Sequence, residues 1–115
     1  HAGDWRQSRA GQSSMELLNP LLPLAETWHD GPLPLTKSFG ALDSDHLKLA
    51  ALKLARDGRG LVARVVETAG RAGKGLVELP FADASFPVEL GPLQVRSYRV
   101  LNGQATEINL VEEDQ

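Results

Sequence analysis

Residues 100–104, Val-Leu-Asn-Gly-Gln (VLNGQ), carry the strongest local structural signal in the chain. Asn102-Gly103 supplies the two positive-φ residues that a type I′ hairpin turn requires. That turn fixes a register in which five pairs face each other: Leu101 with Gln104, Ser97 with Ile108, Tyr98 with Glu107, Arg96 with Asn109, and Val95 with Leu110. The sequence therefore predicts an antiparallel hairpin with one face in the core and one face in solvent.

Short strand-like runs separated by turn residues surround this hairpin. Alternating apolar residues and flanking turn residues place these runs at 46–55, 61–68, 75–81, 92–100 and 105–112. Several short strands at this spacing are typical of an antiparallel sandwich. We expect an all-β fold, an antiparallel β-sandwich with a short N-terminal helix and a Pro-rich extended linker.

A second hairpin is predicted to turn at RDGRG, residues 56–60, with Ala55 opposite Leu61. This register places six side chains on a core face: Leu47, Leu49, Ala51, Leu61, Ala63 and Val65. The other face is apolar too, with Leu52, Leu54, Val62 and Val66 beside Lys48 and Arg64. We expect that face to be covered by the segment from Trp5 to Leu35, with Leu18, Leu22, Leu24 and Trp28 as contacts.

The N-terminal segment differs in composition from the rest of the chain. Asp4 to Leu18 is predicted to be a helix, with Asp4 as N-cap, Gln7 in the capping-box position, and Asn19-Pro20 at its end. Residues 19–35 hold four of the seven prolines, and each removes a backbone donor. We therefore expect residues 1–35 to be a helix and linker, and 36–115 to be the sandwich domain.

Composition excludes several classes of function. The net charge of −3 comes from 15 acidic and 12 basic residues without a basic cluster, so nucleic acid is not an expected partner. No apolar stretch approaches the roughly 20 residues that span a bilayer, so no membrane association is expected. The absence of cysteine excludes disulfides and thiolate metal sites and is compatible with a reducing cytoplasm, the expected location. The start at His1 suggests a processed chain or a piece of a longer protein.

Candidate chemical groups are scattered. His1, His29 and His46 lack the spacing of a helical metal site. Four carboxylates could in principle supply a pair for glycoside hydrolysis, although solvated or ion-paired carboxylates are the favoured interpretation: Glu67, Glu78, Glu89 and Glu107. Ser13, Ser14 and Ser38 lack a nucleophile elbow.

Two further patterns are better explained by structural roles than by binding. The loop GRAGKG, residues 70–75, resembles a phosphate cradle, but it lacks the Gly-Lys-Ser/Thr ending and leads into a strand, which favours a mobile hairpin tip. Trp5, Trp28 and Tyr98 could form a sugar-stacking platform, yet isolated aromatic residues are more often packing residues. We predict no catalytic, cofactor-binding or metal-binding residues in this chain.

Several stretches, in this order, resemble one enzyme family: HAGDW at 1–5, LNPLL at 18–22, ALKLARDG at 51–58, RVVETAGR at 64–71 and INLVEE at 108–113. The chain is similar over nearly its whole length to the C-terminal sandwich of α-mannosidases of glycoside hydrolase family 38. Residues 79–94, LPFADASFPVELGPLQ, are short compared with the family pattern, so a strand or loop is expected to be reduced there.

The resemblance implies a zinc-dependent retaining glycosidase acting in mannose and glycan catabolism. Its zinc ion and aspartate nucleophile belong to an N-terminal domain that this chain does not include, so no catalytic or metal role transfers to any residue here. The chain itself is expected to be inactive, to contact the preceding domains, and to meet glycan only through the parent enzyme. Two alternatives stay open: an independent carbohydrate-binding module, which an exposed aromatic platform would favour, and a freestanding interaction sandwich.

Overall fold

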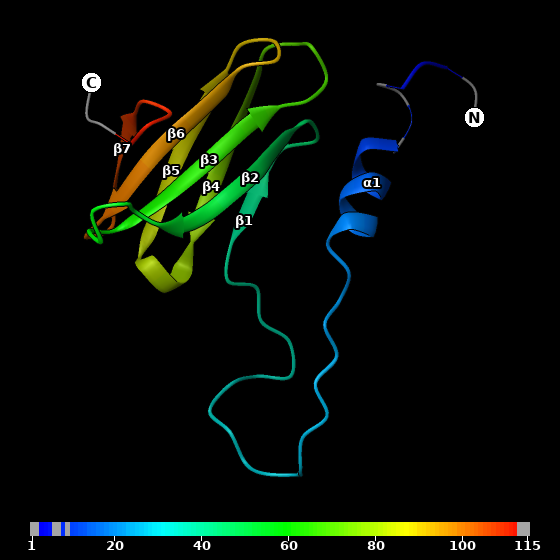
Figure 1. The fold of residues 1–115 in the computed structure, drawn as a ribbon, viewed down its shortest axis with the longest axis vertical. Coiled ribbons are helices and arrows are strands. Elements are labelled where there is room, and N and C mark those ends of the chain that lie inside the picture. The colour runs from blue at the N-terminus through cyan, green and yellow to red at the C-terminus, as the bar shows by residue number, and fades with distance from the viewer. Residues whose placement is uncertain (1–2, 6–7, 9, 113–115) are drawn as a thin grey trace. The chain divides into compact units, whose positions relative to one another are not determined.

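The computed structural model describes residues 3–5, 8 and 10–112 (Figure 1). The chain divides into two units, residues 1–37 and 38–115. In the first unit, helix α1 spans Ala10–Leu18. The Ser8 hydroxyl accepts a hydrogen bond from the Ala10 N–H at 3.3 Å, and the Asn19 side chain donates to the Met15 carbonyl at 2.9 Å. The helix therefore ends where the sequence predicts but starts later than Asp4, while Gln7 lies outside the described residues.

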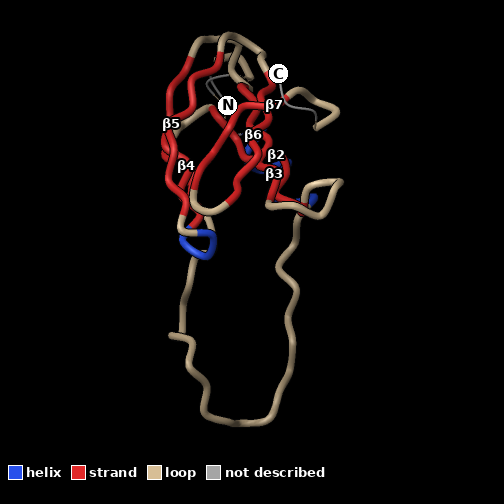
Figure 2. Tube along the Cα trace, turned by 90° about the vertical axis from the view of Figure 1, so that its left-hand side faces the viewer, coloured by secondary structure: helices blue, strands red, loops and turns tan. Residues whose placement is uncertain are grey.

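The second unit contains seven described strands and one 3₁₀ turn. The strands are β1 (Ala41–Asp43), β2 (Leu47–Leu54), β3 (Leu61–Glu67), β4 (Gly73–Leu79), β5 (Ala84–Leu90), β6 (Val95–Leu101) and β7 (Gln104–Ile108), and the turn η1 is Pro80–Ala82. They form two antiparallel sheets with strand orders β1-β4-β5 and β2-β3-β6-β7. Figure 2 shows the two sheets as two layers. The predicted all-β sandwich is confirmed.

Two strands were not predicted. β5 lies inside residues 79–94, which the sequence suggested as a reduced connection, and it pairs with β4 from Gly73↔Leu90 to Leu79↔Ala84. Pro87 lacks a backbone N–H, and a strand with proline is tolerated here because β5 is at the edge of its sheet. β1 has only three residues, too few to show a period.

The connection from β3 to β4 is also different from the prediction. β3 pairs with β2 and β6, whereas β4 pairs with β1 and β5. Residues 68–72 therefore cross from one sheet to the other, and residues 61–81 are not a hairpin. The loop predicted to be a mobile hairpin tip is an inter-sheet crossing.

The hairpin at Asn102-Gly103 forms as predicted. Asn102 and Gly103 have φ of 52° and 77°, and the pairs Leu101↔Gln104, Tyr98↔Glu107 and Ser97↔Ile108 all occur. β7 ends at Ile108, so the predicted pairs beyond it, Val95 with Leu110 and Arg96 with Asn109, do not form.

The β2–β3 register differs from the prediction by one residue at the turn, where Leu54 and not Ala55 pairs with Leu61, and β2 also contains a bulge at Ala50. Leu54 pairs with Leu61, and the register shifts between Leu49 and Ala51. Paired residues lie on the same face of a sheet. Leu52, which pairs with Ala63, and Leu54 therefore lie on the core-facing side with Leu47 and Leu49, and the predicted second face of Leu52, Leu54, Val62 and Val66 does not exist as a set.

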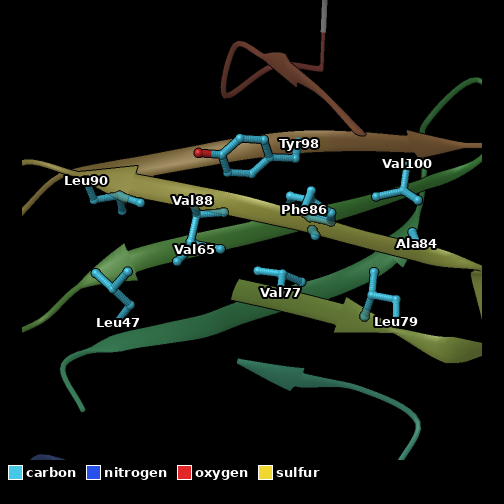
Figure 3. Close-up of a cluster of buried hydrophobic side chains, with 11 residues drawn as sticks. Leu47, Val65, Val77, Leu79, Ala84, Phe86, Val88, Leu90, Tyr98 and Val100 are labelled. Atoms are coloured by element: carbon cyan, nitrogen blue, oxygen red, sulfur yellow. The ribbon is translucent and has the colours of Figure 1, made fainter. Parts of the chain in front are cut away.

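Apolar side chains from both sheets fill the space between them (Figure 3). Ten are labelled there: Leu47, Val65, Val77, Leu79, Ala84, Phe86, Val88, Leu90, Tyr98 and Val100. Tyr98, one of the three candidates for a sugar-stacking platform, is 7% exposed, and its ring centroid lies 5.3 Å from that of Phe86. Burial, followed by the nearby Glu107 carboxylate, raises the pKa of Tyr98. Tyr98 is thus a core residue.

The outer face of the four-stranded sheet has a small core of its own. Val62, Ala55 and Ile108 form a separate buried cluster. Val62 is fully buried within this cluster. Leu18, Leu22, Leu24 and Trp28, which were predicted to cover this face, belong to the first unit, and their contact with the sandwich stays a prediction.

Polar contacts hold the chain after β7. The Arg64 guanidinium donates to the Leu110 carbonyl at 2.9 Å, and that of Arg99 donates to the Glu112 carbonyl at 2.9 Å. The Glu112 carboxylate accepts from the Lys53 ammonium group and from the Arg56 N–H. We call residues 109–112 the C-terminal clasp, because these contacts tie it to β2, β3 and β6.

Candidate functional site

A polar cleft of about 420 Å³ lies where the turn between β1 and β2 meets the β3–β4 crossing. Its lining comes from two segments, Asp43–His46 and Arg71–Lys74 without Gly73. Two carboxylates, two cations, a hydroxyl and an imidazole share this lining. The cleft is therefore one place in the sandwich where polar side chains from separate elements converge.

Glu67, at the end of β3, positions the crossing that forms one wall of the cleft. Its side chain is buried, and its two carboxylate oxygens accept four backbone hydrogen bonds. The donors are the N–H groups of Ala69 at 2.5 Å, Gly70 at 2.8 Å, Arg71 at 3.2 Å and Leu93 at 2.8 Å. Successive N–H groups that converge in this way form an anion-binding nest. An internal carboxylate fills the nest, so the amides of Ala69, Gly70 and Arg71 are not free to cradle a phosphate.

The net effect of this environment is that the pKa of Glu67 is lowered. Burial acts in the opposite direction and raises the pKa, but the hydrogen bonds from the Leu93, Ala69, Gly70 and Arg71 amides lower it by more. Backbone N–H groups favour the ionised form because a carboxylate accepts hydrogen bonds more strongly than a carboxylic acid. Glu67 is therefore a fixed anion that organises a loop, which is the opposite of a general acid with a raised pKa.

Two glycines let the β1–β2 turn approach β4 closely. A Cβ at Gly73 would collide with the His46 ring, and a Cβ at Gly75 would lie 2.9 Å from the Asp43 carbonyl oxygen. Side chains at these two positions would push Asp43–His46 away from the sheet. The glycines of GKG at 73–75 are therefore explained by packing and not by phosphate binding.

His46 is held by its backbone and by the packing of its ring. Its carbonyl accepts hydrogen bonds from the Thr68 N–H at 3.0 Å and the Thr68 hydroxyl at 2.9 Å. Both ring nitrogens are buried without a hydrogen-bond partner among the described residues. The His46 ring packs against Gly73, so it fills the space between the β1–β2 turn and β4.

The cleft offers charged and polar side chains. Its Lys74 side chain forms an exposed ion pair with Glu89 at 2.9 Å. In residues 3–5, 8 and 10–112, no group of three or more His, Asp or Glu side chains is arranged to hold a metal ion. The cleft can bind polar groups, and the hydroxyl in its lining, on Ser44, accepts a hydrogen bond from the Leu47 N–H at 3.2 Å.

The four candidate carboxylates have separate environments. Glu67 binds backbone amides, Glu89 pairs with Lys74, Glu107 pairs with Arg96 at 2.9 Å, and Glu78 is exposed on β4. The interpretation as solvated or ion-paired groups is right for Glu78, Glu89 and Glu107. It is wrong for Glu67, whose partners are uncharged.

The remaining candidates belong to different elements of the chain. His29 and Trp28 lie in the linker of the first unit, and Ser13 and Ser14 lie on α1. Ser38 donates its hydroxyl to the Gly40 carbonyl at 2.8 Å. Trp5 also belongs to the first unit, while Tyr98 is buried in the sandwich core. His1 lies outside the described residues.

Sequence reasoning missed the structural roles of Glu67 and Glu112. An acidic residue at the end of an apolar strand, followed by Thr-Ala-Gly-Arg at 68–71, was a usable signal, because Gly70 permits the positive φ of 72° that a nest needs. Glu112 also has its pKa lowered, first by the Lys53 side chain and then by the Arg56 N–H. No local pattern connects Glu112 with Lys53, because 59 positions separate them.

No protein-family model, curated protein or solved structure matches this chain. No helix among the described residues is long and apolar enough to cross a membrane. The fold and the residues of the cleft are therefore the structural basis for a function.

Proposed function

We propose that this chain is a non-catalytic structural domain, the C-terminal β-sandwich of an α-mannosidase of glycoside hydrolase family 38. A non-catalytic role is supported by the two carboxylates with the most hydrogen bonds, because both hold backbone segments in place. Glu67 fixes the β3–β4 crossing through four backbone amides, and Glu112 fixes the C-terminal clasp. Neither is placed as an acid or a nucleophile.

The assignment to the family rests on the resemblance of five stretches spread from residue 1 to residue 113. The parent enzyme depends on zinc, and the described residues do not fit that ion, because they include no suitable ligand group. The zinc and the catalytic carboxylates are therefore assigned to preceding domains. In this proposal the sandwich supports those domains, in a cytoplasmic enzyme, and contacts glycan only through them.

The proposal is tested on the full product of the gene and on this chain side by side. The full product is expected to hydrolyse an aryl α-mannoside and to bind zinc. Purified 1–115 is expected to show neither turnover nor stoichiometric zinc. Turnover by 1–115 alone, or a full product without mannosidase activity, would contradict the assignment.

The same preparation separates the alternatives. Titration calorimetry of 1–115 with oligomannose is expected to give no binding, because the three candidate stacking residues, Trp5, Trp28 and Tyr98, do not share one exposed face of the sandwich. A saturable isotherm would favour the carbohydrate-binding module. A start codon directly before His1 in the gene would favour the freestanding interaction sandwich.

A further inference from the structure

β2 is the longest described strand, and it lies at the edge of its sheet. It spans eight residues, Leu47–Leu54, and pairs with β3 on one side only. Among the described residues no other strand pairs with its second side. Figure 1 shows β2 at the margin of the four-stranded sheet. Such an edge presents backbone N–H and C=O groups that can pair with another strand.

The sequence of β2, LKLAALKL, reads the same in both directions. Two copies of such a strand, laid antiparallel about a two-fold axis between Ala50 and Ala51, match residue for residue. Leu47 of one copy faces Leu54 of the other, Leu49 faces Leu52, and Lys48 faces Lys53. We propose that two copies of this chain pair through β2 in this register, forming a continuous sheet across the dimer.

The bulge at Ala50 makes the symmetric pairing geometrically consistent. In a regular strand Leu47 and Leu54 would point to opposite faces, because side chains alternate with a period of two. Two residues that pair across neighbouring strands must point to the same face of the sheet. If β2 had no bulge, pairing Leu47 with Leu54 of the other copy would therefore join the core face of one copy to the outer face of the other. Because the bulge shifts the alternation by one residue, Leu47, Leu49, Leu52 and Leu54 all share the core-facing side. The core faces of both copies therefore lie on the same side of the joined sheet.

Pairing also covers apolar surface that the single chain leaves open. Leu52 is 38% exposed and Leu54 is 70% exposed although both lie on the core-facing side. Leu47 and Leu49 are buried or half-buried at the other end of the strand. The proposed register places the covered leucines of one copy beside the exposed leucines of the other. The exposed end of β2 is thus extended by the well-packed end of its partner.

Two features limit the strength of this contact. A pair of eight-residue strands buries less than the roughly 1,200 Å² of a stable interface. Lys48 of each copy faces Lys53 of the other, and like charges directly opposite each other are unfavourable. Part of that repulsion is offset because Lys53 forms an ion pair with Glu112 of its own chain. We therefore expect a dimer that forms with rising concentration.

Charge substitutions test the register by sedimentation equilibrium of the full chain. Lys48→Glu places a carboxylate opposite Lys53 of the other copy at both ends of the ladder, so the dimer is expected to tighten about fivefold. Leu54→Glu is expected to weaken it at least about tenfold, because the new charge would lie beside Leu47 of the second copy. Lys74→Glu is the matched control, since Lys74 lies on β4 in the other sheet and its substitution changes the net charge equally. It is expected to leave the dimer unchanged.

Cross-linking gives a second readout, because the chain has no native cysteine. A Lys48→Cys, Lys53→Cys variant is expected to form a covalent dimer on oxidation, while Lys48→Cys, Lys74→Cys is not. The two β2 cysteines cannot bridge within one chain, because the five strand steps from residue 48 to residue 53 span roughly 16 Å. A wild-type chain that stays monomeric at millimolar concentration would overturn the proposal. So would a dimer that neither Lys48→Glu nor Leu54→Glu alters, since it would use another surface.

Discussion

Replacing Glu67 is expected to destabilise the sandwich more than replacing any exposed carboxylate. The loss of stability should be smaller for Glu67→Gln than for Glu67→Ala. One oxygen accepts from Gly70, Arg71 and Leu93, and the other accepts only from Ala69. Glu67→Gln can keep an oxygen at the position with three bonds, and its NH₂ group then faces the Ala69 N–H. We expect a loss of about 2 kcal/mol for one lost bond, a donor–donor contact and the missing charge.

Glu67→Ala removes all four acceptor contacts and leaves a cavity. Each buried N–H without a partner costs about 1–3 kcal/mol, but the crossing can relax and admit water, so we expect a loss of about 4 kcal/mol. Such a loss is a large part of the 5–15 kcal/mol by which domains are stable. Urea unfolding followed by circular dichroism measures both values, and hydrogen exchange should accelerate at residues 69–71 and at Leu93. Glu89→Gln, on an exposed ion pair, should cost less than about 1 kcal/mol.

The pH dependence has a definite sign. Because the pKa of Glu67 is lowered by folding, its contribution to stability is present above the ordinary glutamate value of about 4.3 and is lost as pH falls through the lower native value. Glu67→Gln should flatten the stability profile in that range. Neutral surface substitutions change the free energy of unfolding by at most about 0.5 kcal/mol. If Glu67→Ala changes it by no more than that, the role assigned to this carboxylate is wrong.

Three further outcomes are expected. Gly73→Ala should lower the free energy of unfolding by about 1–3 kcal/mol, because its methyl group meets the His46 ring. Gly91→Ala, whose new Cβ would have its nearest neighbour at 3.4 Å, should be nearly neutral in the same urea titration. Equal effects of the two substitutions would contradict the packing argument. Glu112→Gln should lower the melting temperature and speed hydrogen exchange at the Arg56 amide. The higher stability of the wild type should disappear as pH falls through the lowered native pKa of Glu112. Unchanged exchange would mean that the C-terminal clasp does not depend on the charge. A chain shortened to residues 38–115 should keep its melting temperature in differential scanning calorimetry, because the buried core side chains all lie between residues 47 and 108; a large fall would show that the N-terminal unit stabilises the sandwich.

Most strands of this protein could be predicted because their signals are local. Alternating apolar residues mark the positions of β2, β3 and β6, and Asn102-Gly103 determines the register of β6 with β7 because a two-residue turn allows only one pairing. The helix end at Asn19-Pro20 is local for the same reason. Such signals lie within a few residues of the structure that they specify.

Tertiary structure alone decided which strands share a sheet and which groups share a site. The pairing of Leu54 with Leu61 places Leu52 and Leu54 on the core-facing side, and the bulge at Ala50 places Leu47 and Leu49 on that side too. No residue type in LKLAALKL predicts the bulge. β3 and β4 are neighbours in sequence but lie in different sheets, because burying both apolar faces requires two layers. Leu93, the one distant partner of Glu67, and the partners of Glu112 come from segments that only the folded chain brings together. Long-range packing and the burial of polar groups select these contacts, and neither quantity can be read from a short window of sequence.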